Sequence, residues 1–142
     1  MTSIVFIVPG QPQGKARPRV GKVGGHARMF TPPKTVAYEG LIAHAAQQAM
    51  QGRVLITGAV SVVMDVRCLV PESWSKTKKA QALIGGVYPT TKPDIDNVEK
   101  AVFDGLNGVA WRDDVQVVKV TKSKRYAPVP GVYVEIIPLE AA

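Results

Sequence analysis

Four aspartates in two short pairs are the residues of this sequence best suited to catalysis. Asp94 and Asp96 stand two residues apart in "KPDIDNVEK" (92–100), and Asp113 and Asp114 are adjacent in "WRDDVQ" (111–116). Carboxylates that lie close together repel each other, so they stay anionic only beside a cation. Mg²⁺ and Mn²⁺ take hard oxygen ligands from a few carboxylates, with water and substrate phosphate completing the shell. The two pairs therefore predict a divalent-metal site.

The net charge is unevenly distributed along the chain. The 142 residues have a net charge of +7, yet six of the 11 acidic residues fall between 94 and 114, beside only two bases. That window has a net charge of −4, which leaves +11 for the rest. A basic surface binds the phosphates of nucleic acids, and a metal ion offsets the repulsion at one of them. This distribution favours a metal-dependent nuclease.

A lysine accompanies the first acidic pair. Lys100 follows Asp96 by four residues, so both lie on one side of a helix predicted from residue 95. A cation beside a metal site can stabilise the negative charge that develops on a phosphate oxygen or a leaving group. The apolar stripe that would hold this helix to the core consists of Ile95, Val98, Val102, Leu106 and Val109.

Each carboxylate also has a purely structural interpretation. Asp94 or Asp96 fits a helix N-cap, and Asp96 with Glu99 fits a capping box. The Asp113-Asp114 pair fits a polar turn. On this interpretation the chain is a non-catalytic basic protein that binds RNA or DNA. Metal-dependent nicking of DNA distinguishes the two hypotheses.

Periodicity predicts the elements that must position these residues. Apolar alternation indicates strands over 3–8, 54–70, 115–125 and 131–137, and helical spacing indicates helices over 34–51 and from 95. A short basic helix is expected within 71–86, with Ser73 or Ser75 as its N-cap. We expect a single α+β domain over 1–142 with a small mixed or antiparallel sheet and two main helices, in the order β-α-β-α-β-β.

Two basic segments are predicted to bind the DNA backbone. Residues 14–33 form a Gly/Pro-rich stretch without an acidic residue, interpreted as a mobile loop, and residues 71–90 form a basic insert. The alternative for the first segment is a solvated loop without function. Trp74 in the insert either stacks on a base or packs against the protein. The DNA-binding residues predicted in the two segments are Lys15, Arg17, Arg19, Lys76, Lys78 and Lys79.

Few other features indicate chemistry or compartment. Cys68 is the single cysteine, so it cannot form an internal disulfide and is typical of a reducing compartment. The first apolar run is too short for a signal peptide or a membrane span, which favours a cytoplasmic protein. The two histidines, His26 and His44, lie far from the acidic window in sequence.

The segment "TTKPDIDNVEKAVFDGLNGVAWRDDVQV" (90–117) closely resembles the signature of the RusA family of Holliday junction resolvases, which is common in bacteria and their prophages. The shared features are DxDN, a lysine four residues after the second Asp, and Asp-Asp followed by x-Gln after an aromatic turn. The segments "GKARPR", "TPPKT" and "SWSKTKKAQAL" are similar more loosely.

This resemblance implies a Mg²⁺-dependent homodimer that resolves four-way DNA junctions by paired symmetric nicks in DNA recombination and repair. It implies that Asp94, Asp96, Asp114 and Lys100 are the catalytic residues of this crossover junction endodeoxyribonuclease. The three aspartates would hold Mg²⁺, with Mn²⁺ as a substitute, and Asp113 would be a supporting neighbour or an alternate ligand. The expected location is the cytoplasm of a bacterial host, with a phage- or prophage-type gene. A nuclease for other branched DNA, such as flaps or forks, is the alternative.

Overall fold

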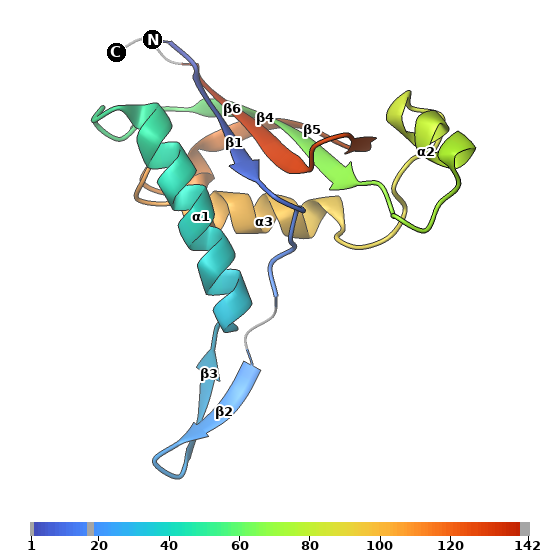
Figure 1. The fold of residues 1–142 in the computed structure, drawn as a ribbon. Coiled ribbons are helices and arrows are strands. Elements are labelled where there is room, and N and C mark those ends of the chain that lie inside the picture. Colours follow the sequence, from blue (N-terminus) through green and yellow to red (C-terminus); the bar gives the residue numbers. More distant parts are fainter. Residues whose placement is uncertain (1, 17–18, 140–142) are drawn as a thin grey trace.

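The computed structural model describes residues 2–16 and 19–139. Strands β1 (Ile4–Pro9), β4 (Val60–Leu69), β5 (Val117–Ala127) and β6 (Gly131–Pro138) form one sheet in the order β1-β6-β4-β5. Strands β4 and β5 pair in parallel, whereas β6 is antiparallel to both β1 and β4. This mixed sheet, with its helices, confirms the predicted α+β class (Figure 1).

Two helices pack together beneath the sheet and form the core with it. Helix α1 (Pro33–Met50) contacts β1 and α3 (Ile95–Leu106), and α3 also contacts β5. The apolar stripe predicted for α3 is confirmed at Val98, Val102 and Leu106, which have no exposed surface. Gly105 allows the two helices to approach closely, because a Cβ there would lie 2.8 Å from Ile42 Cγ2. No helix in the described ranges is long and apolar enough to cross a membrane.

Alternation along the strands decides which side chains face the helices. In β1, Ile4, Phe6 and Val8 are buried, whereas Val5 and Ile7 are about half exposed on the other side. The same rule applies to the edge strand β5, where Lys122 is paired with Met64 in the neighbouring strand. Because Met64 is buried in the core, Lys122 turns toward the helical side of the sheet.

The structure corrects the loop predicted over 14–33. Part of that segment forms an antiparallel hairpin of β2 (Arg19–Val23) and β3 (His26–Phe30), which projects away from the sheet and helices (Figure 1). Its two-residue turn consists of Gly24 and Gly25, both with positive φ, which only glycine adopts at little cost. A Gly-Gly turn between two five-residue strands is a hairpin signal that the sequence contained.

The other helices and strands agree with the predictions, apart from some of their boundaries and the position of β5 in the sheet. The strand expected over 54–70 begins only at Val60, and α3 ends at Leu106, so that Val109 lies in the following turn. Helix α2 (Lys76–Leu83) is capped by Ser75, whose Oγ accepts a hydrogen bond from Lys78 N. Strands β5 and β6 do not form a hairpin, because β4 lies between them.

Candidate active site and comparison with known proteins

The two residues of the first acidic pair occupy different positions at the start of α3. Asp94 is the N-cap, and its Oδ1 accepts a hydrogen bond of 2.7 Å from Asn97 N. Asp96 lies inside the first turn with its side chain exposed, so the capping box expected between Asp96 and Glu99 does not form. Within this pair, only Asp94 caps the helix.

An open cavity of about 410 Å³ lies between α3 and the beginning of β5. Asp96, Glu99 and Lys100 line it from α3, and Asp114 lines it from the short 3-10 helix η1 (Asp114–Gln116). Its apolar lining consists of Phe103, Val117 and Val120. The fold thus brings together Asp96, Lys100 and Asp114, three residues selected from sequence as catalytic, and adds Glu99 to them.

Lys122 reaches the same carboxylates from β5. Its Nζ lies 2.6 Å from Asp96 Oδ1 and 3.3 Å from Glu99 Oε1. The pKa of Lys122 is raised, mainly by the hydrogen bond to Asp96. Burial acts in the opposite direction, and the hydrogen bond to Glu99 raises the pKa further. Lys122 is not among the residues that were selected from the sequence. The signal that was missed is its position in β5, two residues after the cavity-lining Val120, on the helical side of the sheet.

A capping box fixes the second acidic pair. Asp113 is the N-cap of η1, where its Oδ1 accepts from Val115 N at 3.1 Å, while Gln116 Oε1 accepts from Asp113 N at 3.2 Å. Gln116 Nε2 also donates to the carbonyls of Ile56 and Gly58, at 2.7 and 3.0 Å. Gln116 therefore ties the turn to the segment before β4, and gives the glutamine of the Asp-Asp-x-Gln motif a positioning role.

Asp114 lies in an environment that disfavours its negative charge. Its burial raises the pKa of the carboxyl, and the adjacent Asp113 raises it further, as does the charge of Asp104. A hydrogen bond from Asn107 opposes these effects only in part. Asn107 is itself held by buried Trp111, whose Nε1 donates to Asn107 Oδ1 at 2.7 Å. A cation at the cavity would relieve this unfavourable electrostatic environment.

A second ion-pair network lies where the chain approaches the β2–β3 hairpin, which we call the hairpin arm. Lys15 Nζ lies 2.8 Å from Glu39 Oε2 on α1 and 2.9 Å from Asp104 Oδ2 on α3. Asp104 is also 4.0 Å from Lys100 Nζ. Lys15 thus joins α1 and α3, and its side chain is only 18% exposed. Its predicted contact with DNA stays a prediction.

Asp94 lines a different cavity from Asp96. This cavity, of about 500 Å³, lies where the chain leaves β1 and where α1 and α3 begin, and it includes Lys34, Lys92 and Asn97. Among the residues that the structure describes, no three carboxylate, histidine or cysteine side chains are grouped closely enough to hold a metal ion by themselves. The four predicted carboxylates therefore do not form one preassembled cage.

The donors nevertheless fit a Mg²⁺ or Mn²⁺ ion. Mg²⁺ keeps several waters and is held through one or two carboxylates together with substrate phosphates, rather than by an all-protein cage. Asp96 and Asp114 supply such carboxylates from two segments that line one open cavity, and Glu99 supplies a third oxygen donor nearby. Among the described residues that line this cavity, the anionic donors are carboxylate oxygens, which suit a hard cation.

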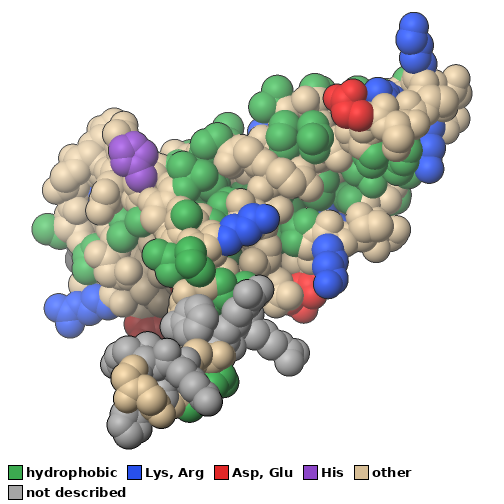
Figure 2. Space-filling model, turned by 60° about the horizontal axis from the view of Figure 1, so that its bottom comes forward, with side chains coloured by type: hydrophobic (Ala, Val, Ile, Leu, Met, Phe, Trp, Pro, Cys, Tyr) green, Lys and Arg blue, Asp and Glu red, His purple; other side chains and the backbone are tan. Residues whose placement is uncertain are grey.

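The predicted DNA-binding residues are spread over the molecule. Arg17 lies outside the described residues, as does the side chain of Arg19 in β2. Lys76 and Lys78 are exposed on α2, and Lys79 is half-buried. Figure 2 shows lysine and arginine side chains distributed over the face drawn there rather than gathered in one patch.

Trp74 packs in the manner of a structural residue. Its ring lies edge-on to Tyr126, with 5.3 Å between centroids, and Lys78 Nζ lies 3.9 Å from the centroid of the same ring. The packing alternative for Trp74 is thus supported, and the cation–π contact fixes Lys78 above it. Cys68 is buried in β4.

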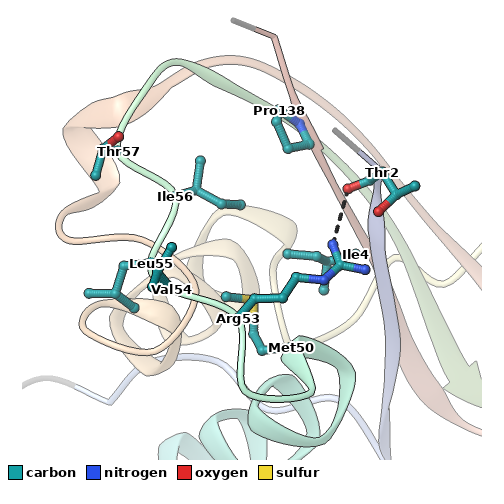
Figure 3. Close-up of a pocket in the computed structure, with 9 residues that line it drawn as sticks. All are labelled: Thr2, Ile4, Met50, Arg53, Val54, Leu55, Ile56, Thr57 and Pro138. Atoms are coloured by element: carbon teal, nitrogen blue, oxygen red, sulfur yellow. Dashed lines mark hydrogen bonds between the residues drawn. The ribbon is translucent and has the colours of Figure 1, made fainter. Parts of the chain in front are cut away.

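A third cavity, of about 450 Å³, is lined by none of the predicted site residues. It lies between the end of α1 and the ends of β1 and β6, and is lined mainly by apolar side chains (Figure 3). Arg53 lines it and donates to Thr2 O at 3.4 Å. Among the residues described as lining this cavity there is no carboxylate, and none of them lines the acidic cavity.

Comparison with known proteins agrees with the motif. The family model described as "Endodeoxyribonuclease RusA" matches residues 9–137. The uncharacterized protein YqaN of Bacillus subtilis (strain 168) is 40% identical over 138 residues, covering 96% of this chain and 96% of that protein. The match includes both acidic pairs, α3, β5 and the hairpin arm. The chain therefore belongs to the RusA endodeoxyribonuclease family.

Proposed function

We propose that the protein is a divalent-metal-dependent endonuclease that resolves Holliday junctions by paired symmetric nicks. The observation that carries this proposal is a cavity lined by two carboxylates and a lysine: Asp96 and Lys100 from α3, and Asp114 from η1. Family membership supports a nuclease that acts on branched DNA. The distribution of charge supports the same function, because six of the 11 acids of this basic chain lie between residues 94 and 114.

In the proposed site, Asp96 and Asp114 hold a Mg²⁺ or Mn²⁺ ion, and Asp94, which lines a different cavity, is a further ligand. When bound, such an ion supplies Lewis-acid stabilisation of the scissile phosphate and an activated water. Asp113 supports Asp114 through the turn that it caps. The raised pKa of Asp114 is consistent with this assignment, since the crowded carboxyl gains most from a neighbouring cation.

Lys100 is proposed to stabilise the negative charge that develops on the phosphate or the leaving oxygen. Its side chain is 64% exposed and lines the cavity, so a DNA strand can reach it. The pairing with Asp104, at 4.0 Å, holds the ammonium on this side of α3 without burying it. A preoriented cation of this kind lowers a barrier because it need not reorganise during the reaction.

The DNA backbone is proposed to run past the cavity that Asp94 lines. Lys34 and Lys92 line it, and the hairpin arm begins beside it. Lys76, Lys78 and Lys79 on α2, with Arg17 and Arg19 near and in the arm, would contact more distant phosphates. A homodimer would give one site for each of two symmetric strands, since a four-way junction itself has two-fold symmetry.

The proposal is tested by incubating the protein with a synthetic four-way junction, a fork, a flap and a linear duplex in Mg²⁺. We expect nicks at matching positions on opposed strands of the junction and much slower cleavage of the linear duplex. Sedimentation under the same conditions should give a dimer. Binding without any Mg²⁺-dependent nicking would indicate a non-catalytic protein, and preferential cleavage of forks or flaps would change the substrate.

A further inference from the structure

Lys122 contacts two carboxylates of α3 that line the acidic cavity. Its Nζ contacts Asp96 Oδ1 at 2.6 Å and Glu99 Oε1 at 3.3 Å. The lysine and Glu99 are each 24% exposed, whereas Asp96 is 82% exposed. Lys122 therefore approaches from the protein side, along β5, and leaves the outer side of Asp96 open to solvent.

The two carboxylates need positive charge between them. Asp96 and Glu99 are three residues apart on one helix, which makes them neighbours on its surface. Like charges at this spacing repel, and the Lys122 ammonium offsets the repulsion. A divalent ion bound to these two carboxylates would offset the same repulsion, and Asp96 Oδ1 would have to leave Lys122 to become a ligand. The ammonium and the metal ion thus compete for one pair of carboxylates.

We propose that Lys122 is a positioning residue that holds Asp96 and Glu99 in place and competes with the divalent cation for them, thereby weakening cation binding in the absence of DNA. The inference rests on the proposed metal site and adds a residue to it. The ammonium allows Asp96 and Glu99 to lie close together in the cavity without a metal ion. The proposed consequence is a lower affinity for the free ion, so that the phosphate of bound DNA contributes a larger share of the final coordination.

The test measures Mn²⁺ binding by titration calorimetry on the full chain without DNA. In Lys122→Met we expect the Kd for Mn²⁺ to fall by about three- to tenfold, because an ion pair of partly exposed groups no longer competes. Lys119→Met is the matched control. It removes the same charge from β5, but at an exposed residue on the other side of the sheet, and its Kd should stay within about twofold of the wild type.

An unchanged or weaker affinity in Lys122→Met would overturn the proposal, as would an equal change in Lys119→Met. A second variant, Lys122→Arg, keeps the positive charge and should restore a Kd near that of the wild type. If Lys122→Arg tightens Mn²⁺ binding as much as Lys122→Met, charge competition is not the cause.

Thermal unfolding provides a readout that does not depend on activity. In EDTA, Lys122→Met should unfold at a lower temperature than Lys119→Met, because Asp96 and Glu99 then repel each other without compensation. Mn²⁺ should raise its melting temperature by more than that of the wild type, and an equal rise would contradict the proposal. Mn²⁺ binding that is absent from both the wild type and Lys122→Met, or unaffected by Asp114→Asn, would instead show that the proposed metal site itself is wrong.

Discussion

The two acidic pairs of this protein are built alike although they lie in different elements. In each pair the first carboxylate caps a helix: Asp94 accepts from Asn97 N at the start of α3, and Asp113 accepts from Val115 N at η1. In each pair the second carboxylate, Asp96 or Asp114, lines the acidic cavity. The caps thereby fix the backbone from which the two cavity residues extend.

The pairs differ in what compensates the second carboxylate. Asp96 has a lysine at 2.6 Å, whereas the pKa of Asp114 is raised by burial and by the neighbouring charges of Asp113 and Asp104. Capping needs an acceptor oxygen, and metal binding needs negative charge. Substitution by Asn keeps the first property and removes the second, so it separates the two roles residue by residue.

The largest effect is expected from removing charge at the cavity. Asp96→Asn and Asp114→Asn should each lower the nicking rate of a junction in Mg²⁺ by at least about a hundredfold, because a ligand loses its anionic oxygen. Junction binding in EDTA should stay the same or become tighter, since less negative charge faces the phosphates. The measurement compares nicking in Mg²⁺ with affinity in EDTA for both variants.

Lys100→Met is the companion variant for this comparison. It should also lose cleavage, but it should keep Mn²⁺ binding, and its junction affinity should be unchanged or slightly weaker. Near-normal nicking by Asp96→Asn would return the first pair to a purely structural role.

A smaller loss of nicking is expected at the first cap. Asp94→Asn should fold with the stability of the wild type, because Asn caps a helix about as well as Asp, but its nicking should fall by about tenfold or more if Asp94 is also a ligand. Asp94→Ala should show the same loss of nicking and, in addition, a free energy of unfolding lower by about 1 kcal/mol. Urea unfolding of the two variants beside the nicking assay separates the cap from the ligand. Full activity of Asp94→Asn would restrict the site to the cavity carboxylates.

Local sequence patterns predicted the parts of the fold that depend on local periodicity. The apolar spacing of Val98, Val102 and Leu106 identified the buried side of α3, and the spacing of Asp96 and Lys100 placed both beside the cavity. These are properties of one helix, and they do not depend on what packs against it. The family resemblance then selected Asp114, and the fold places it at the same cavity.

The remaining features depend on contacts between distant segments. The pairing of Lys122 with Asp96 joins residues 26 positions apart, and it requires that β5 form the edge of the sheet next to α3. The insertion of β4 between β5 and β6 is a choice of topology that alternation within each strand does not encode. The anchoring of Lys15 by Glu39 and Asp104 likewise needs α1 and α3 side by side.

Removing the support of the second pair should have a moderate effect. Gln116→Ala loses the hydrogen bonds to the carbonyls of Ile56 and Gly58 and half of the η1 capping box. We expect a free energy of unfolding lower by about 1–2 kcal/mol and nicking reduced several-fold, because the turn that carries Asp114 loosens. Chemical denaturation and nicking are measured beside Gln47→Ala, an exposed glutamine on α1. If Gln116→Ala is as active and as stable as this control, Gln116 has no positioning role.

The smallest effect is expected at Asp113, and it decides between the two adjacent aspartates. Asp113→Asn keeps an oxygen that can accept from Val115 N, so η1 should form and nicking should stay within about twofold of the wild type. Asp113→Ala should instead lower the free energy of unfolding by about 1 kcal/mol, because the cap is lost. Asp114→Asn, one residue later, should be nearly inactive yet as stable as the wild type or more stable, since it removes a crowded carboxylate. Nicking rates and unfolding curves for the three variants check this contrast directly. Loss of nicking in Asp113→Asn with activity kept in Asp114→Asn would reverse the assignment and make Asp113 the ligand. Loss in both would show that the second pair, like the first pair in the proposed site, uses both of its carboxylates for the metal ion.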